Sequence, residues 1–312
     1  MTNETAINVE NLKRFYGKFE AVSGITFNVK KGAVFGFLGP NGAGKTTTLY
    51  VLTGLLKPNA GSVKVLGLDP GSDGSELRSR IGCLLEEPGI YDTMTLYENL
   101  LFFGRAQNMN EKKIRERIKD ELEFFSLSDY SKKRCATLSK GMRQKAALAR
   151  AMLCEPEILF LDEPTANLDP VSSAGFRDLI LELARKRGAT VFLNTHRLDE
   201  AQRVCDSVAI IKSGKILACG TVEELRKNSG KHSVVVTAKN ISKEIASKVT
   251  GDLGRLSRTD GDFLYYELSS EERIPILIQK LVAEGALIYE VRQEKLSLED
   301  IFIELVEENN VA

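Results

Sequence analysis

The chain has 312 residues, 43% of them hydrophobic, which is enough for one large domain with a small one or for two medium domains. Lysine plus arginine and aspartate plus glutamate each number 43, so no overall basic charge favours a nucleic acid partner. The five cysteines include no CxxC pair, which argues against a disulfide framework or a zinc site. We expect no signal peptide, and no apolar run approaches the roughly 20 residues that span a bilayer. If the protein works at a membrane, another chain must span it.

The first forty residues predict three strands that lead into a glycine-rich loop. Residues 6–9 and 25–29 have the alternating pattern of half-buried strands, and residues 34–38 are continuously apolar. The loop that follows fits the phosphate-binding pattern of Gly, four residues, Gly, Lys and then Ser or Thr. Its residues are Gly39, Pro40, Asn41, Gly42, Ala43, Gly44, Lys45, Thr46 and Thr47.

The chemistry of phosphate binding explains the residue types in this loop. Glycines allow backbone N–H groups to crowd onto phosphate oxygens, and a helix that begins near Lys45 points its positive dipole end at the same anion. Lys45 adds a full positive charge, and the Thr46 hydroxyl is able to bind Mg²⁺. Tyr16, upstream of the loop, has two open interpretations, since an aromatic ring there packs in the sheet or stacks on adenine.

The middle of the chain predicts an inserted helical subdomain. After strands at residues 62–65 and 81–85, Thr95 and Glu98 have the spacing of a capping box at the start of a helix. A second helix is predicted over residues 111–125 from its apolar face. The nearby aromatic residues form plain core or a docking pocket for a partner helix, and the sequence leaves both open. They are Tyr91, Tyr97, Phe102 and Phe103.

A second anion-binding helix end is predicted in the heptapeptide at residues 138–144. A helix is expected to run from here to about residue 153. Ser139 comes directly before it, and Gly141 lies in its first turn. The Ser139 hydroxyl and the first backbone N–H groups of such a helix face outward toward an anion. One nucleotide does not obviously need two such helix ends.

Two further buried strands end in polar side chains on the expected phosphate side of the sheet. The apolar run at residues 158–161 is followed by Asp162 and Glu163, which we expect to hold Mg²⁺ and to polarise an attacking water, respectively. A strand at residues 190–194 is followed by His196, which lies within reach of a γ-phosphate. Asp169 and the proline after it fit the N-cap and first position of a helix.

The C-terminal part predicts a separate small α+β domain. A linker is expected at residues 226–232, where the composition changes. Beyond it, six segments with strand or helix patterns predict a βαββαβ unit. Ser297 and Asp300 fit a capping box for a last amphipathic helix. This domain is expected to stabilise or to dimerise the protein, and no catalytic pattern occurs in it.

Taken in order, the motifs resemble those of the ATP-binding cassette (ABC) transporter ATPases over about residues 6–225. The resemblance implies an α/β fold of the P-loop NTPase cassette type, with a parallel core sheet, an antiparallel β part and a helical subdomain at about residues 87–155. It implies domains at residues 1–225 and 233–312. Tyr16 is similar to the family's A-loop, residues 39–47 to its Walker A motif and residues 138–144 to its signature. Residues 158–165 are similar to the Walker B motif, residues 166–169 to the D-loop, and Thr195 with His196 to the switch histidine.

The resemblance also accounts for two anion-binding helix ends. In this family two cassettes pair head to tail, so Ser139 and Gly141 of one chain close over the ATP held by Lys45 of the other. With ATP and Mg²⁺ as cofactors, Glu163, His196 and the D-loop residue Asp169 are implied to act in hydrolysis. A homodimer, or a pair with a second cassette chain, is therefore expected.

One residue departs from the family pattern. Most members have a glutamine, before the helical subdomain, that contacts Mg²⁺ and the attacking water, whereas this chain has Glu86. A carboxylate still binds Mg²⁺, but it adds negative charge near the γ-phosphate and donates no hydrogen bond when ionised. The hypothesis is that Glu86 keeps the metal-sensing role and changes the rate of hydrolysis.

The C-terminal segment 297–302 and the stretch around residues 91–105 resemble the ATPases of prokaryotic drug, antibiotic and polysaccharide exporters with separately encoded permeases. An exporter ATPase, in the cytoplasm and peripheral on the inner face of the cell membrane, is the function implied. Two alternatives remain at this stage. One is a soluble cassette protein of DNA repair or translation, and the other is a regulatory cassette with impaired hydrolysis, for which Glu86 is the motive. The balanced charge argues against the first, and intact Glu163 and His196 argue against the second.

Overall fold

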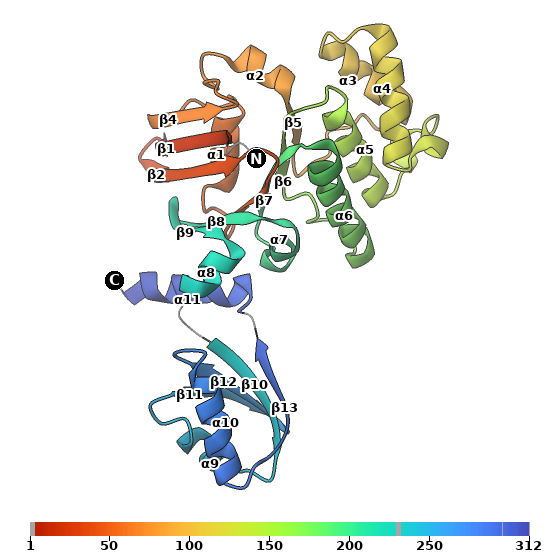
Figure 1. The fold of residues 1–312 in the computed structure, drawn as a ribbon. Coiled ribbons are helices and arrows are strands. Elements are labelled where there is room, and N and C mark those ends of the chain that lie inside the picture. Colours follow the sequence, from red (N-terminus) through yellow and green to blue (C-terminus); the bar gives the residue numbers. More distant parts are fainter. Residues whose placement is uncertain (1–3, 229–231, 295, 312) are drawn as a thin grey trace. The chain divides into compact units, whose positions relative to one another are not determined.

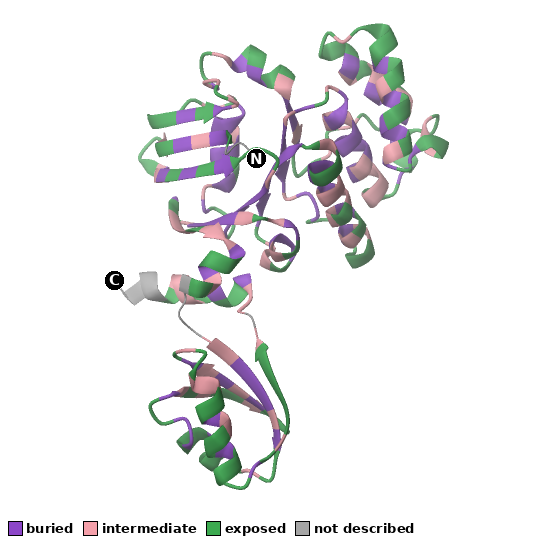
Figure 2. Ribbon diagram, in the orientation of Figure 1, coloured by how far each residue is buried: buried purple, intermediate pink, exposed green. Residues whose placement is uncertain are grey.

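The structure, a computed structural model, describes residues 4–228, 232–294 and 296–311. The chain divides into two compact units, Met1–Cys219 and Gly220–Ala312. Hydrophobic clusters lie within each of them (Figures 1 and 2). None of the described helices is both long enough and apolar enough to cross a membrane.

A six-stranded sheet forms the centre of the first unit. Its strand order is β5-β6-β7-β3-β8-β9. The strands β3, β6 and β7 are buried at every residue, as expected for parallel strands covered on both faces, and this confirms the prediction from their apolar runs. Their bounds are β3 Val34–Leu38, β5 Ile81–Leu84, β6 Ile158–Asp162, β7 Thr190–Thr195, β8 Ser207–Lys212 and β9 Lys215–Thr221.

A three-stranded antiparallel sheet covers one side of this centre. It consists of β1 (Thr5–Tyr16), β2 (Phe19–Lys30) and β4 (Ala60–Val65) in the order β2-β1-β4. Ile7 and Val9 of β1 are fully buried while Glu10 is exposed, because successive side chains of a strand point to opposite faces. Helix α1 (Lys45–Leu52), which begins in the glycine-rich loop, belongs to the same hydrophobic cluster.

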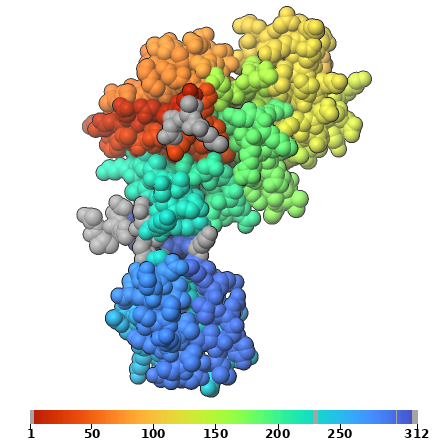
Figure 3. Space-filling view, in the orientation of Figure 1, coloured from red at the N-terminus to blue at the C-terminus, as the bar shows by residue number. Residues whose placement is uncertain are grey.

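The helical subdomain has the predicted helices, with ends within one or two residues of those expected. They are α3 (Leu96–Ala106), α4 (Glu111–Phe124) and α5 (Lys140–Met152). The Thr95–Glu98 capping box is present. In the space-filling view the yellow residues of α3 and α4 form a lobe at one side of the first unit (Figure 3).

Four of the described α-helices and strands of the first unit have no counterpart in the sequence predictions. They are α2 (Gly74–Arg80), α7 (Leu198–Val204), β8 and β9. Helix α6 (Pro170–Arg187), in contrast, begins at the predicted N-cap Asp169 and ends at Gly188 in the left-handed conformation.

The second unit contains the predicted βαββαβ order. Its sheet has the order β11-β12-β10-β13, and residues of α9 and α10 share a core with Val234, Val236 and Tyr266 of the sheet. The elements are β10 (His232–Lys239), α9 (Lys243–Lys248), β11 (Gly254–Asp260), β12 (Phe263–Leu268), α10 (Arg273–Ala283), β13 (Leu287–Glu294) and α11 (Leu298–Val311).

The expected linker at residues 226–232 is largely not a loop where the structure describes it. Residues 226–228 are the end of helix α8 (Val222–Asn228), and His232 begins β10. Residues 229–231 lie outside the described residues. Arg226 of α8 donates a hydrogen bond from Nε to the Leu296 carbonyl, 2.7 Å away, just before α11.

A buried carboxylate ties the helical subdomain to α6. Glu121 of α4 is fully buried, and both of its oxygens accept hydrogen bonds from Arg187 Nη1, at 2.7 and 2.8 Å. Arg117 contacts the same carboxylate from one turn away. Two guanidinium groups therefore contact one buried carboxylate.

Removing one of these guanidinium groups should destabilise the first unit. Burial raises the pKa of the Glu121 carboxyl and the two arginines oppose that shift, so we expect Arg187→Met to lower the free energy of unfolding by about 3 kcal/mol, because the buried carboxylate loses a hydrogen-bonded partner. Arg185→Met, an exposed change on the same helix, should leave it within about 0.5 kcal/mol of the wild type. Urea unfolding followed by circular dichroism measures both, and equal effects of the two variants would contradict this account.

Candidate nucleotide and phosphate site

The carboxyl ends of three adjacent parallel strands bring the predicted site residues together. In the sheet Leu38 pairs with Thr195, and Asp162 pairs with Asn194. The glycine-rich loop follows β3, Glu163 follows β6 and His196 follows β7. Ligand sites of such sheets lie at this edge, since all the strand ends and their loops meet there.

Two glycines of the loop have no room for a side chain. A Cβ on Gly39 would lie 2.1 Å from the Ile211 carbonyl oxygen, and one on Gly44 would lie 2.5 Å from the Ala21 carbonyl oxygen. Gly44 also has a φ of 105°, in the region that other residues rarely adopt. The loop is therefore packed between β2 and β8, and its conformation depends on these two glycines.

The Lys45 ammonium group lies inside the loop. Its Nζ donates hydrogen bonds to the carbonyl oxygens of Gly39 at 2.8 Å and Pro40 at 3.2 Å, and Glu163 Oε1 is 3.6 Å away. The side chain is 6% exposed. A buried charge needs such partners, and an anion entering the loop could replace them.

Thr46 and Asp162 form an oxygen-rich pair next to Lys45. The Thr46 hydroxyl donates to Asp162 Oδ2 at 3.1 Å, and Asn194 Nδ2 donates to Oδ1 at 3.3 Å. Burial raises the pKa of the Asp162 carboxyl, while these two hydrogen bonds oppose the shift. The carboxylate is thus poorly solvated and suited to a cation.

This pair fits the way proteins bind Mg²⁺. Within the described ranges no three or more His, Cys, Asp and Glu side chains form a metal-binding group. Mg²⁺ commonly takes one or two protein oxygens and completes its shell with phosphate oxygens and water. Thr46 Oγ1 and Asp162 Oδ2 supply two hard oxygen donors beside the phosphate loop, which is the donor set such a site requires.

Glu163 is held in place by its backbone and by β7. Its φ is 46°, unusual for a residue with a side chain, and its N–H donates to the Asn194 carbonyl at 2.9 Å. The Thr195 hydroxyl donates to Oε2 at 3.1 Å, and His196 Nδ1 lies 2.9 Å from Oε1. The contact between the Thr195 and Glu163 side chains was not predicted from the sequence.

A cavity of about 250 Å³ runs from Tyr16 to these carboxylates. Tyr16 is 46% exposed, with the Arg14 guanidinium 5.1 Å from its ring centre. Phe19, 64% exposed, lies across the β1–β2 turn and was not predicted as a site residue. The residues that line this cavity are Tyr16, Phe19, Ala21, Asn41, Gly42, Gly44, Lys45, Thr46, Thr47, Glu86, Asp162 and Glu163.

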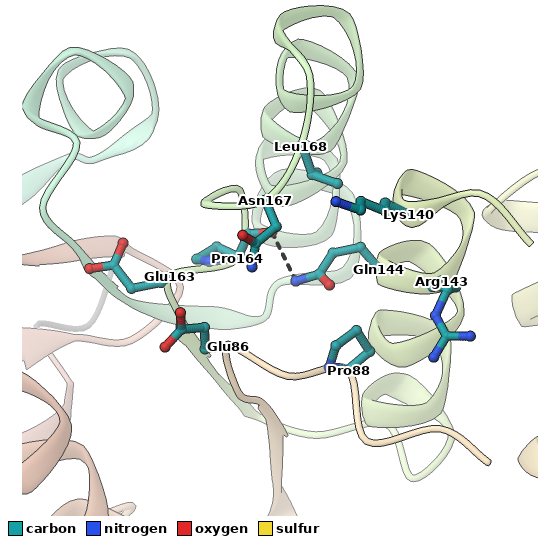
Figure 4. A pocket seen from close by; sticks show the side chains of 9 residues that line it. All are labelled: Glu86, Pro88, Lys140, Arg143, Gln144, Glu163, Pro164, Asn167 and Leu168. Carbon is teal, nitrogen blue, oxygen red and sulfur yellow. Dashed lines mark hydrogen bonds between the residues drawn. The ribbon is translucent and has the colours of Figure 1, made fainter. Parts of the chain in front are cut away.

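Glu86 lies between this cavity and a second one of about 260 Å³. Figure 4 shows the carboxylates of Glu86 and Glu163 at the same end of the second cavity. Gln144, on its opposite wall, donates a hydrogen bond to the Pro164 carbonyl at 2.8 Å. The second cavity is lined by Glu86, Pro88, Lys140, Arg143, Gln144, Glu163, Pro164, Asn167 and Leu168.

Seven predicted site residues do not line the Tyr16–Glu163 cavity, namely Gly39, Pro40, Ala43, His196, Ser139, Gly141 and Asp169, and the last three belong to the starts of α5 and α6. Ser139 is the N-cap of α5 and accepts a hydrogen bond from the Met142 N–H at 3.3 Å. Asp169 caps α6, where Oδ1 accepts from the backbone of Val171 and Ser172, each at 3.0 Å. A Cβ on Gly141 would lie 3.1 Å from Ser172 Oγ, so the two helix starts meet.

Comparison with known proteins gives matches along nearly all of the chain. The family described as "ABC transporter" matches residues 22–166, and "ATP-binding protein DrrA1-3-like, C-terminal domain" matches residues 220–306. The bacitracin transport ATP-binding protein BcrA of Bacillus licheniformis is 34% identical, over 97% of each chain. The daunorubicin resistance ATP-binding protein DrrA3 of Streptomyces coeruleorubidus is also 34% identical, over 97% of this chain and 96% of the relative.

A solved structure supports the fold. The structure described as cbiO1 from Clostridium perfringens, part of the ABC transporter complex cbiONQ, has a TM-score of 0.67 at 29% identity. The match covers 79% of this chain and 95% of that one. The expected fold, an ATP-binding cassette with a C-terminal domain, is confirmed.

The raised pKa of Asp162 gives a test in the nucleotide-free protein. A carboxyl whose pKa is higher in the folded state than its ordinary 3.8 binds its proton more tightly when folded, so ionisation above that pH favours unfolding. We therefore expect Asp162→Asn to raise the free energy of unfolding by about 1 kcal/mol at pH 7.5, as removal of a functional charge often does.

The gain should shrink as the pH falls and disappear about one unit below 3.8, where the wild-type carboxyl is protonated in both states. Asp178→Asn, exposed on α6, is the matched control and should show little effect at either pH. Denaturant titrations at several pH values measure the difference. A loss of stability in Asp162→Asn at pH 7.5 would contradict the assignment of an unfavourable buried charge.

Proposed function

Since this chain belongs to the family of ABC transporter ATP-binding proteins, we propose that it binds and hydrolyses ATP to power an exporter whose permease is a separate chain. Support for export comes from relatives matched along nearly their whole length, which are named for bacitracin transport and daunorubicin resistance. The C-terminal unit, matched by the DrrA-like family, extends the likeness beyond the cassette. Association with the inner face of the membrane through that permease is part of the proposal.

One observation carries the chemical part of the proposal, namely the meeting of Lys45, Thr46, Asp162 and Glu163 in one cavity with Tyr16 at its other end. The adenine ring of ATP stacks on Tyr16, and the phosphates take the place of the loop carbonyls around Lys45. The loop 39–47 supplies backbone N–H groups to the phosphate oxygens. Thr46 and Asp162 would hold Mg²⁺, which would supply positive charge to neutralise the phosphates.

Hydrolysis uses the carboxylate that β6 and β7 hold in place. Glu163 accepts a proton from a water molecule as the water oxygen bonds to the γ-phosphorus, and the bond from that phosphorus to the bridging oxygen breaks. His196, 2.9 Å from Glu163, turns its imidazole toward the γ-phosphate. Thr195 keeps the Glu163 side chain oriented through the 3.1 Å hydrogen bond.

Completion of the site needs a second cassette. Ser139 and Gly141 lie away from the cavity of their own chain, at an exposed helix start where N–H groups favour an anion. We propose that two copies pair head to tail, so that each α5 start closes over the ATP on the other copy. Asp169 caps α6 next to Gly141. It therefore belongs to the face that pairs with the second copy, and we propose that it acts in hydrolysis through that contact.

The permease is proposed to dock in a groove of about 360 Å³ next to β5. Leu55, 61% exposed, and Phe103 are among its lining residues. Arg150 lies at its base, 4.8 Å from the Phe103 ring, and donates hydrogen bonds to the carbonyls of Pro88 and Gly89 at 2.9 and 2.6 Å. A helix that enters the groove therefore acts on the segment that follows Glu86.

The aromatic residues near this groove divide into a packed pair and an exposed pair, and we propose the docking role for the exposed pair. Tyr97 and Phe103 pack against the core of the helical subdomain. Tyr91 and Phe102 remain 48% and 42% exposed, with ring centres 5.3 Å apart. Exposed aromatic surface of this kind supports a partner interface.

Glu163→Gln provides the test of ATP-driven pairing. Glutamine keeps the shape of the side chain but cannot accept the proton, so ATP stays intact between two closed cassettes. We expect the variant to elute as a dimer in gel filtration with ATP and Mg²⁺, and as a monomer with ADP at the same protein concentration. The double change Glu163→Gln with Lys45→Ala is the control and should stay monomeric with ATP. A monomeric profile of Glu163→Gln at high protein concentration would count against the proposal.

Glu86 provides a test of metal sensing. If its carboxylate contacts Mg²⁺ or its water shell, Glu86→Gln should change both the rate of ATP hydrolysis and the Mg²⁺ concentration for half-maximal activity, by about threefold or more. Glu87→Gln, the exposed neighbour, serves as the control. Phosphate release measured across a Mg²⁺ series decides the matter. Unchanged rate and unchanged Mg²⁺ dependence in Glu86→Gln would remove Glu86 from the site.

A further inference from the structure

The last strand of the C-terminal sheet, β13, is an edge strand with an apolar surface. Within the described residues it pairs with β10 and has no strand on its other side (Figure 1). Leu287, Tyr289 and Val291 are 56%, 65% and 41% exposed, and the strand is mostly exposed in Figure 2. An edge of this kind presents backbone N–H and C=O groups to any chain that can add a strand.

Charged residues usually protect such an edge, but here their order permits self-pairing. Arg292 lies opposite Val235 of β10 and Glu290 lies opposite Thr237, so both point to the sheet face away from the helix-covered core. Like charges that meet across a strand pair oppose pairing, whereas opposite charges favour it. The strand carries Glu290, Arg292 and Glu294, and Arg292 Nη2 lies 3.2 Å from Glu294 Oε1, so a Glu290 from a second strand would share Arg292 with Glu294.

The register of a symmetric pair follows from these charges. In an antiparallel pair of two β13 strands centred on Val291, Glu290 of each copy lies opposite Arg292 of the other. A pair centred on Glu290 or on Arg292 would instead bring two like charges face to face. Centring on Val291 also keeps the helix-covered faces of both sheets on one side.

We propose that β13 is a homodimerisation edge, at which a second copy of this chain adds its own β13 in the Val291-centred register. The partner is another C-terminal unit, and the contact is isologous, since each strand supplies the same residues. Backbone hydrogen bonds provide the attraction, and the two Glu290–Arg292 pairs select the register. This contact needs no nucleotide, so it differs from the ATP-dependent pairing of the cassettes, and the gel-filtration test of that pairing is made in chains that also carry Glu290→Arg, in which the β13 contact is disfavoured.

Disulfide formation in the nucleotide-free full chain tests the register. With Cys219 replaced by serine, Val291→Cys places two thiols opposite each other, where Cα atoms about 5 Å apart allow a disulfide. Tyr289→Cys is the control. Its two thiols would lie four residues out of register, about 13 Å apart. If disulfides formed only by chance collisions, the more exposed position 289 would cross-link faster. The proposal instead predicts dimer bands on a non-reducing gel that are at least tenfold stronger for position 291.

Charge reversal tests the partner residues in the same Val291→Cys chain. Glu290→Arg should reduce the rate of disulfide formation roughly fivefold, because two Arg–Arg contacts replace two ion pairs. Adding Arg292→Glu restores the opposite charges and should return the rate to the starting value. These positions are exposed, so melting curves should be unchanged. Equal cross-linking at positions 289 and 291, or no recovery in the double reversal, would overturn the proposal.

Discussion

The Lys45 ammonium group is buried, and its partners are two backbone carbonyls and one carboxylate. A buried cation requires such compensation, and these contacts come from two parts of the fold. The carbonyls belong to the loop after β3, and Glu163 belongs to the end of β6. The loop takes this shape only because Gly39 and Gly44 leave room for the neighbouring carbonyls of Ile211 and Ala21.

The same arrangement leaves the folded protein under strain at its site. Glu163 has a positive φ, and Asp162 is a poorly solvated carboxylate with a raised pKa. In the function proposed above, Mg²⁺ would offset the charge of the Asp162 carboxylate, and part of the binding energy of ATP would be available to bring two cassettes together. The account thus links the chemistry of one cavity to the movement of whole subunits.

Much of this could be predicted from the sequence, because the decisive signals are local. Continuous apolar runs gave β3, β6 and β7, and the spacing of Thr95 with Glu98 gave the start of α3. Phe19 was missed since its place beside Tyr16 depends on the β1–β2 register, and Gln144 was missed since its partner Pro164 is distant in sequence. The short segments of β8 and β9 carry no pattern beyond that of many apolar stretches. The part of the site that we propose for Ser139 would depend on a second copy, which no single chain contains.

A mixing experiment tests most directly whether the site is shared between two copies. Lys45→Ala removes the phosphate contact of the copy that carries it. Ser139→Arg blocks the helix end that would close over the ATP bound to the opposite copy. Neither variant alone should hydrolyse ATP, but a mixture forms mixed dimers that retain one intact composite site. Steady-state phosphate release that reappears on mixing, above the sum of the two variants alone, is the predicted result. A mixture as inactive as its components, with both variants folded by circular dichroism and dimers shown to exchange, would contradict the shared site.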